Sequence, residues 1–239
     1  MKIKTIIFLL FLLPTILLAQ KSKVWNKPLY DAYKYHFGFA FSGGLLDFSV
    51  THSENFMSDT TINSIEGQAR PLFGVSMVSN LRLNENFDLR FTPGLYFGQR
   101  NLVYNHNVLN KTDSTYSPQQ HVMKIETTFL QFPLNIKYRA VRENNYRPYV
   151  VFGVNYVIDL AARKKIKEEE KPKIRLYRQD ILLEAGFGVD YYLPFFKLST
   201  ELRFSYGLMN IVNYDDTPYT NNTFERLGTK MVSLIVFFE

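Results

Sequence analysis

The stretch FLQFPLNIKYRA, residues 129–140, constrains the fold more than any other part of the sequence, because apolar and polar side chains alternate along it almost without a break. One side carries Leu130, Phe132, Leu134, Ile136 and Tyr138, and the other carries Gln131, Pro133, Asn135, Lys137 and Arg139. A period of two residues is that of a β-strand whose two faces meet different surroundings. The segment therefore predicts a strand with one face in an apolar environment and a charged face turned away from it.

Six further segments alternate in the same way, and a seventh also has the composition of a strand. The eight predicted strands span residues 36–44, 72–83, 87–100, 123–140, 148–159, 181–193, 197–208 and 229–238. The last of them is apolar on both sides, which leaves its facing open. Short connections at 84–86, at 140–147 and near Pro194 alternate with long gaps at 45–71, 101–122, 160–180 and 209–228.

This alternation of short and long connections is typical of outer-membrane barrels, whose turns lie in the periplasm and whose loops lie outside. The chain is 16% aromatic and, beyond residue 20, has no apolar run as long as a membrane helix. An even number of strands also returns both termini of the chain to the periplasmic side. We therefore expect an all-β fold, an eight-stranded antiparallel transmembrane β-barrel with short periplasmic turns and long extracellular loops.

A soluble eight-stranded barrel or sandwich is the alternative. Such a protein buries its apolar face and exposes its charged one, and strand alternation alone fits either orientation. Three features favour the membrane barrel: an N-terminus laid out like a secretory signal peptide, the absence of Cys, and the unequal connections.

The N-terminus has the layout of a secretory signal peptide. Lys2 and Lys4 precede an apolar run from Ile6 to Leu18, and Ala19 offers a cleavage point. A membrane anchor is the alternative, but the run is shorter than the roughly 20 residues that a spanning helix needs. We expect a signal peptide at 1–19, a periplasmic leader at 20–35 and the barrel at 36–239. The leader holds the only Trp of the chain and is either disordered or a short element that contacts another envelope component.

Little in the sequence points to catalysis or to a bound metal. The chain has no Cys, which excludes disulfides and thiolate metal sites. Its four His are His36, His52, His106 and His121, all near strand ends or in predicted loops. No G-x-S-x-G, H-x-x-x-H or EF-hand pattern accompanies them. We expect a non-enzymatic protein without cofactor or metal, and a barrel enzyme acting on lipid is kept as a lesser hypothesis. The net charge of +6 is too mild to indicate nucleic acid.

If the apolar faces meet lipid, the charged faces line the lumen. The inward charges would then be Arg82, Asp88, Arg90, Arg100, Lys137, Arg139, Asp159, Glu184, Asp190, Lys197, Glu201 and Arg203. An eight-stranded barrel is just wide enough for side chains to fill it, and buried charges are costly unless they pair. We expect a structural network of ion pairs that plugs the barrel, with no open pore.

Two polar segments are candidate contact sites. The charge run at 163–178 is either a solvated loop or a docking site for a partner or for anionic lipid. The turn with Arg142, Asn144, Asn145 and Tyr146 is a candidate docking turn, because these residue types suit polar and aromatic contacts. The turn has a simpler interpretation, in which it only closes a hairpin.

The run TTFLQFPLNIKYRAVRENNYRPYVVFGVNYVIDLAARK, residues 127–164, resembles the signature region of the PorT family of outer-membrane proteins, which is named SprT in gliding bacteria. The strand FPLNIKYR, the turn NNYRPYV and the strand end YVIDLA carry the resemblance. It implies an integral protein of the cell outer membrane that supports type IX protein secretion and gliding motility through contacts with other secretion or envelope proteins. The rest of the chain looks like many small outer-membrane barrels, so a generic barrel with an envelope-stabilising or adhesive role is the alternative.

Overall fold

The computed structural model describes residues 25–52, 62–109, 116–163, 174–213 and 224–239. The predicted signal peptide and most of the charge run at 163–178 lie outside these residues. Among the described residues, no helix is long and apolar enough to cross a bilayer.

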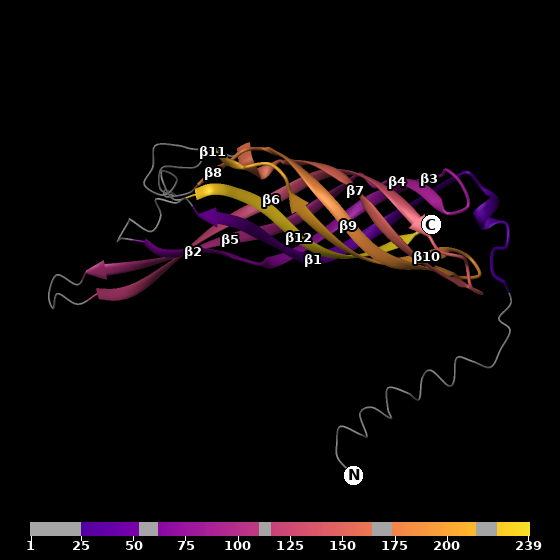
Figure 1. Ribbon diagram of the computed structural model, residues 1–239, viewed down its shortest axis with the longest axis horizontal. Coiled ribbons are helices and arrows are strands. Elements are labelled where there is room, and N and C mark those ends of the chain that lie inside the picture. The colour runs from indigo at the N-terminus through magenta and orange to yellow at the C-terminus, as the bar shows by residue number, and fades with distance from the viewer. Residues whose placement is uncertain (1–24, 53–61, 110–115, 164–173, 214–223) are drawn as a thin grey trace, which may run out of the picture.

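The described strands form one closed, antiparallel ring (Figure 1). Its members are β1 (Tyr35–His52), β3 (Arg70–Arg82), β4 (Phe87–Phe91) continued by β5 (Gly94–Leu109), β6 (Tyr116–Arg139), β7 (Tyr146–Asp159), β9 (Gln179–Tyr192), β10 (Lys197–Gly207) and β12 (Phe224–Phe238). Each strand pairs with the next along the chain, and β12 pairs with β1 to close the ring. The eight-stranded antiparallel barrel is therefore confirmed.

The ring has two unlike ends. The turn end carries the tight connections 83–86, 140–145 and 193–196, together with the described part of the leader. The opposite loop end carries the longer connections, with β2 (Ile62–Gln68), which pairs with β5 and leads into β3. In Figure 1 the loop end lies on the left and the turn end on the right.

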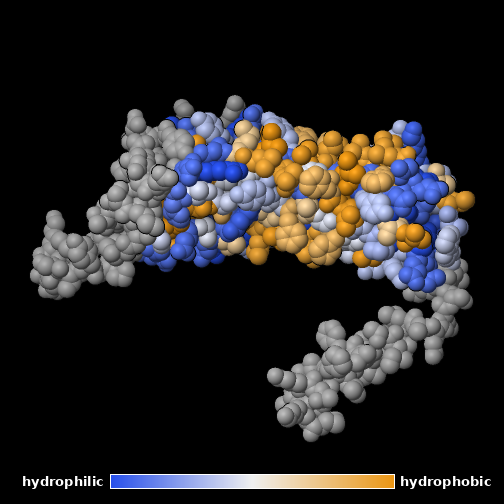
Figure 2. Space-filling view, viewed as in Figure 1, coloured by the Kyte–Doolittle hydropathy of each residue, from blue (hydrophilic) through white to orange (hydrophobic). Residues whose placement is uncertain are grey.

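Apolar side chains cover the outside of the turn-end half, and its inside holds buried charges beside a small apolar cluster that includes Ile235 and Phe237. Phe37, Phe73 and Phe152 are 69%, 62% and 57% exposed, while Lys137 and Asp190 are 0% exposed. Figure 2 shows the resulting orange belt, with bluer surface towards both ends. A soluble barrel would have the opposite arrangement, so this facing matches the lipid-facing prediction.

The prediction of long connections at 45–71 and 101–122 is wrong, because most of these residues belong to β-strands. β1 continues to His52, β2 begins at Ile62, and the β5–β6 hairpin extends from Leu109 back to Tyr116. The walls of the barrel are therefore taller on this side than the sequence pattern indicated.

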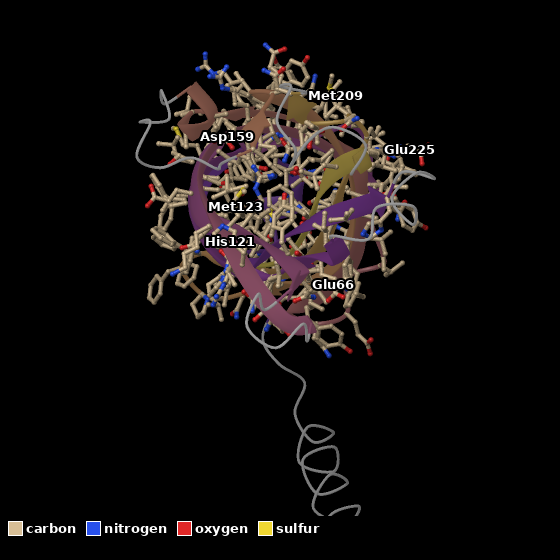
Figure 3. The ribbon with its side chains drawn as sticks, turned by 90° about the vertical axis from the view of Figure 1, so that its left-hand side faces the viewer. Glu66, His121, Met123, Asp159, Met209 and Glu225 are labelled. Carbon is tan, nitrogen blue, oxygen red and sulfur yellow. The ribbon has the colours of Figure 1, made fainter. Side chains whose placement is uncertain are left out.

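Apolar side chains close the interior at the loop end. A small sheet of β8 (Arg175–Leu176) and β11 (Val212–Asn213) follows the short η3 helix (Ala161–Arg163) and contributes to this closure. The loop-end cluster comprises Phe48, Ile65, Leu102, Tyr104, Met123, Ile174, Leu176, Ile211, Val212 and Leu227. Figure 3 looks into this end, where side chains including that of Met123 crowd the inside of the ring.

Candidate functional site

The interior of the turn-end half is a network of buried charges. Eleven of the twelve predicted lumen charges are no more than 4% exposed, namely Asp88, Arg90, Arg100, Lys137, Arg139, Asp159, Glu184, Asp190, Lys197, Glu201 and Arg203. The twelfth, Arg82, lies half-buried at the mouth, where its guanidinium donates to the carbonyl oxygen of Asp31.

The buried charges lie in ion pairs, and those of Lys137 with Asp190 and of Arg90 with Glu201 join strands that are not neighbours in the ring. Lys137 Nζ lies 2.7 Å from an Asp190 carboxylate oxygen. The Arg203 guanidinium contacts Glu184 at 3.1 Å and Glu201 at 2.5 Å, and Arg90 reaches Glu201 at 3.2 Å. Each pair offsets part of the desolvation cost of its members, which isolated charges could not do at this depth.

Nearer the loop end, Arg100 continues the network. Its guanidinium contacts the Asp159 carboxylate at 3.1 Å and lies 4.5 Å from the ring centre of Phe48 in the loop-end cluster. A cation above an aromatic face is favourable. Arg100 thus joins the charged half of the interior to the apolar half.

Glu239, which follows β12, is a lumen charge that the sequence analysis missed. Its carboxylate contacts Lys197 at 2.5 Å and Arg90 at 3.2 Å, and its side chain is fully buried. The signal was present, because inward Ser233, Ile235 and Phe237 share its odd-numbered register. The prediction had left the facing of this strand open.

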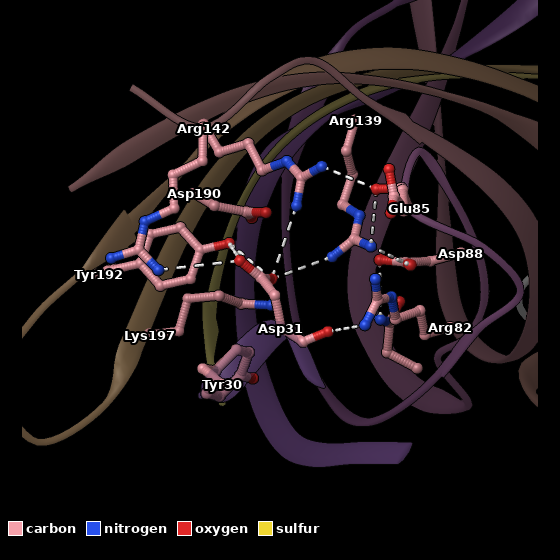
Figure 4. A network of polar contacts seen from close by, with 12 residues as sticks. Tyr30, Asp31, Arg82, Glu85, Asp88, Arg139, Arg142, Asp190, Tyr192 and Lys197 are labelled. Atoms are coloured by element: carbon pink, nitrogen blue, oxygen red, sulfur yellow. Dashed lines mark hydrogen bonds and ion pairs between the residues drawn. The ribbon is translucent and has the colours of Figure 1, made fainter. Parts of the chain in front are cut away.

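The leader folds across the turn end and delivers a second missed charge, Asp31 (Figure 4). Asp31 lies in the η1 helix (Tyr30–Ala32), and its carboxylate accepts a hydrogen bond of 3.0 Å from the Tyr192 hydroxyl. Three guanidinium groups, from Arg139, Arg142 and Arg147, lie 3.2, 3.7 and 3.6 Å from it. We call these four partners the Asp31 cradle.

Residues on both sides of Asp31 fix the leader further. The Asn26 side chain donates to the Tyr192 carbonyl at 2.9 Å, and the Asn26 amide donates to the Asn145 side chain at 2.9 Å. The Arg142 guanidinium lies between rings, 3.6 Å from the centre of Tyr192 and 4.9 Å from that of Trp25. These contacts hold the described leader against the barrel, whereas the sequence left open whether it is ordered.

Tyr30 places the leader directly beneath the lumen network. Its ring stacks on His36 with centroids 4.2 Å apart, and its hydroxyl donates to the Glu239 carboxylate at 3.2 Å. Burial, with the nearby Glu239 carboxylate, raises the pKa of the Tyr30 hydroxyl far above its ordinary value. The hydroxyl therefore stays protonated and remains a donor.

The candidate docking turn has an inner and an outer half. Arg142 and Asn145 point to the leader, as described above. Asn144 and Tyr146 are exposed, and Asn144 has a positive φ of 52°. Asn tolerates this left-handed conformation better than most residues, which suits it to the tip of the turn.

Large apolar side chains are exposed around the same end. Leu29, Tyr33 and Leu83 are 69%, 63% and 56% exposed, and Val141 and Phe195 are 82% and 89% exposed. They come from the leader and from all three short turns. We call these five residues the turn-end patch.

The three His whose side chains the structure describes do not form a site together. His36 is buried beneath Tyr30, His52 Nε2 lies 3.0 Å from the Ile65 carbonyl oxygen, and His121 is exposed. Within the described ranges, no group of three or more His, Asp or Glu could hold a metal ion.

Comparisons with known proteins indicate an outer-membrane class. A family model described as "Outer membrane protein beta-barrel domain" matches residues 19–213. No curated protein matches this sequence.

Several solved barrels are similar in structure. Neisserial surface protein A is 13% identical, with 86% of this chain and 99% of that chain covered and a TM-score of 0.41. OprG from Pseudomonas aeruginosa is 13% identical, with 86% and 94% covered and a TM-score of 0.43. The outer membrane enzyme PagL is 10% identical, with 83% and 99% covered and a TM-score of 0.37.

Proposed function

Because the chain belongs to the outer membrane protein β-barrel domain family, we propose that it is a closed, non-enzymatic scaffold that supports type IX protein secretion through contacts at its turn end. Its location in the outer membrane follows from that family. The secretion role rests on the resemblance at 127–164. The strongest structural support for the secretion role is that residues 127–164 also form most of the Asp31 cradle, through Arg139, Arg142 and Arg147.

The filled interior supports a scaffold in preference to a channel. Buried ion pairs occupy the belt region, the leader lies across the turn end, and the apolar cluster fills the loop end. Eight-stranded barrels have little interior space beyond that of their side chains. Steady ionic current through the purified protein in a planar bilayer would contradict this part of the proposal.

The turn-end patch supports a protein contact. Exposed large apolar side chains beside Arg and Tyr are the composition of protein interfaces. In a barrel whose short turns are periplasmic, this end faces the compartment through which exported cargo passes. The partner is therefore a periplasmic or inner-leaflet component of the secretion machinery.

The patch can be tested in a deletion strain that expresses variants of the protein. Leu29→Ser with Phe195→Ser removes two exposed apolar side chains and should leave the cradle intact. We expect normal amounts in the outer membrane, a normal mobility shift on heating in detergent, and cargo retained in the periplasm. The matched control is Tyr177→Ser with Met209→Ser, which changes two exposed side chains at the loop end, 56% and 43% exposed. Normal export in the patch variant, or an equal defect in the control, would contradict the proposed surface.

The docking turn can be tested by halves. Asn144→Gly with Tyr146→Ser alters only the outer half, and Gly suits the positive φ at position 144. Arg142→Gln with Asn145→Ser alters the half that holds the leader. If the turn itself docks the partner, the first pair blocks export. If it acts by holding the leader, only the second does.

Loss of the gene also separates the proposal from its alternative. A secretion component should trap cargo in the periplasm when it is deleted. Normal secretion combined with a weakened envelope or reduced adhesion would instead assign the chain to the generic small barrels.

A further inference from the structure

The outer wall carries a groove near the loop-side edge of the apolar belt. It has a volume of about 460 Å³ and spans β9, β10, β12 and β1. Its floor is one cross-strand row, in which Leu45 pairs with Val232, Val232 with Phe204, and Phe204 with Ala185. Ala185 has the smallest side chain in this row, so the surface is recessed at Ala185 next to the larger side chain of Phe204.

The next row towards the loop end is polar. Asp47 pairs with Lys230, and Lys230 pairs with Tyr206. Lys230 Nζ lies 3.1 Å from the Asp47 carboxylate, yet the Lys230 side chain is 54% exposed. The Arg226 guanidinium lies 5.8 Å from the ring centre of Tyr206. The upper end of the groove thus holds the Lys230–Asp47 pair above an apolar floor, and Arg226 lies just outside the lining, beside Tyr206.

We propose that this groove binds one membrane lipid with a phosphate-bearing anionic headgroup, its acyl chain lying over Ala185 and its phosphate meeting Lys230 and Arg226. The order of the two rows matches such a lipid, because β12 runs from Lys230 through Val232 and Leu234 towards the middle of the belt. A headgroup at the loop-side interface would send its chain in that direction. The excess of positive charge at the upper end supplies the complement to a phosphate.

A second groove repeats the arrangement and supports the inference. It has a volume of about 580 Å³ between β3, β5 and β6. Arg70, Lys124 and Glu126, two cations and one anion, line it above Phe73 and Phe97, whose ring centroids are 5.4 Å apart. An excess of basic over acidic side chains above an apolar floor, at two places on the wall, is expected if lipid phosphates lie at this level.

Native mass spectrometry of the full protein in detergent tests the proposal with two probes that share their acyl chains. Dioleoylphosphatidylglycerol has the anionic phosphate, and dioleoylglycerol lacks it. We expect the wild-type protein to prefer the phosphatidylglycerol by about fivefold, the effect of one basic residue near an anionic membrane surface. Lys230→Gln should remove this preference without weakening dioleoylglycerol binding, whereas Lys34→Gln, an exposed cation at the turn end, should change neither.

Ala185→Phe fills the groove and should lower the number of retained lipids by one. Val75→Phe, which adds bulk at a 48% exposed position on β3 outside both grooves, is its control. A mobility shift on heating verifies that each variant has folded. Equal lipid retention by the two Phe variants, or no preference between the two probes, overturns the proposal and indicates unselective annular lipid. Specific retention of a protein in place of lipid overturns it as well.

Discussion

The turn-end and loop-end halves of the barrel place their apolar side chains on opposite faces. The turn-end half is apolar outside, as in a membrane barrel, and the loop-end half is apolar inside, as in a soluble barrel. In the turn-end half, the inside holds paired charges such as Lys137 and Asp190, and the outside holds Leu134, which is 44% exposed. In the loop-end half, Leu102 is fully buried inside, while Lys124 on the outside is exposed. The same strands therefore pass from hydrocarbon into water. In hydrocarbon their apolar face points outward, and in water it points inward.

The change of solvent appears in the sequence as a shift of phase. In β5, outward Leu95 and Phe97 give way to inward Leu102 and Tyr104, so apolar residues move from odd to even positions. In β1 the same shift separates outward Phe41 from inward Leu46 and Phe48. A strand that leaves the hydrocarbon keeps its period of two residues, but its apolar residues move from the outward face to the inward face.

The largest effect is expected from breaking a buried pair in the turn-end half. Asp190→Leu leaves Lys137 without its carboxylate in a site that is 0% exposed, which should lower the free energy of unfolding by about 3–5 kcal/mol. Urea titration of the protein folded in lipid vesicles measures this. Lys137→Met combined with Asp190→Leu removes both charges and should recover most of the loss. A double variant as unstable as the single one would mean that packing, not charge, matters here.

A smaller effect should separate the two halves on a single strand, β6. Leu134→Arg puts a cation into the belt and should cost about 2–4 kcal/mol of unfolding free energy. Val122→Arg makes the corresponding outward change in the loop-end half, where Val122 is 36% exposed, and should cost no more than about 0.5 kcal/mol. The same vesicle titration compares them. Equal costs would remove the boundary that the phase shift places between these two positions.

A destabilisation smaller than that of Leu134→Arg should come from the loop-end cluster. Ile65 is fully buried there, and Ile65→Val deletes one methylene from an apolar core, which should cost about 1 kcal/mol. The cost should not depend on salt, because no charge is involved. If the variant is as stable as the wild type, the cluster is not packed as a core.

The sequence predicted the strands because each one has hydrocarbon on its outer face and polar side chains on its inner face. This difference imposes an alternation of apolar and polar residues. The prediction failed where that alternation changes phase, which is why residues 45–52 and 101–109 were assigned to gaps. Local alternation also cannot tell which charges meet across the lumen, since pairing such as that of Arg90 with Glu201 depends on the register of strands far apart in the chain.

Asp31 was missed for a different reason. It lies outside any strand, and its three Arg partners all come from one hairpin, residues 139–147, which is distant in sequence from the leader. The leader meets this hairpin only because it folds back across the turn end, which no local pattern encodes. The two halves of the candidate turn were likewise indistinguishable in sequence, because only the leader makes one half an inner surface.

The position of Glu239 has a consequence for how the barrel assembles. Lys197 and Arg90 contact its carboxylate, and Tyr30 donates to it, although these residues lie in β10, β4 and the leader. Lys197 can meet this carboxylate once β12 pairs with β10, but Arg90 and Tyr30 lack it until β12 also pairs with β1. An open intermediate in the bilayer therefore keeps the Arg90 cation without this partner. Half-formed barrels are thereby disfavoured, so insertion should be cooperative, with the docking of the leader and the closing of the ring as one event.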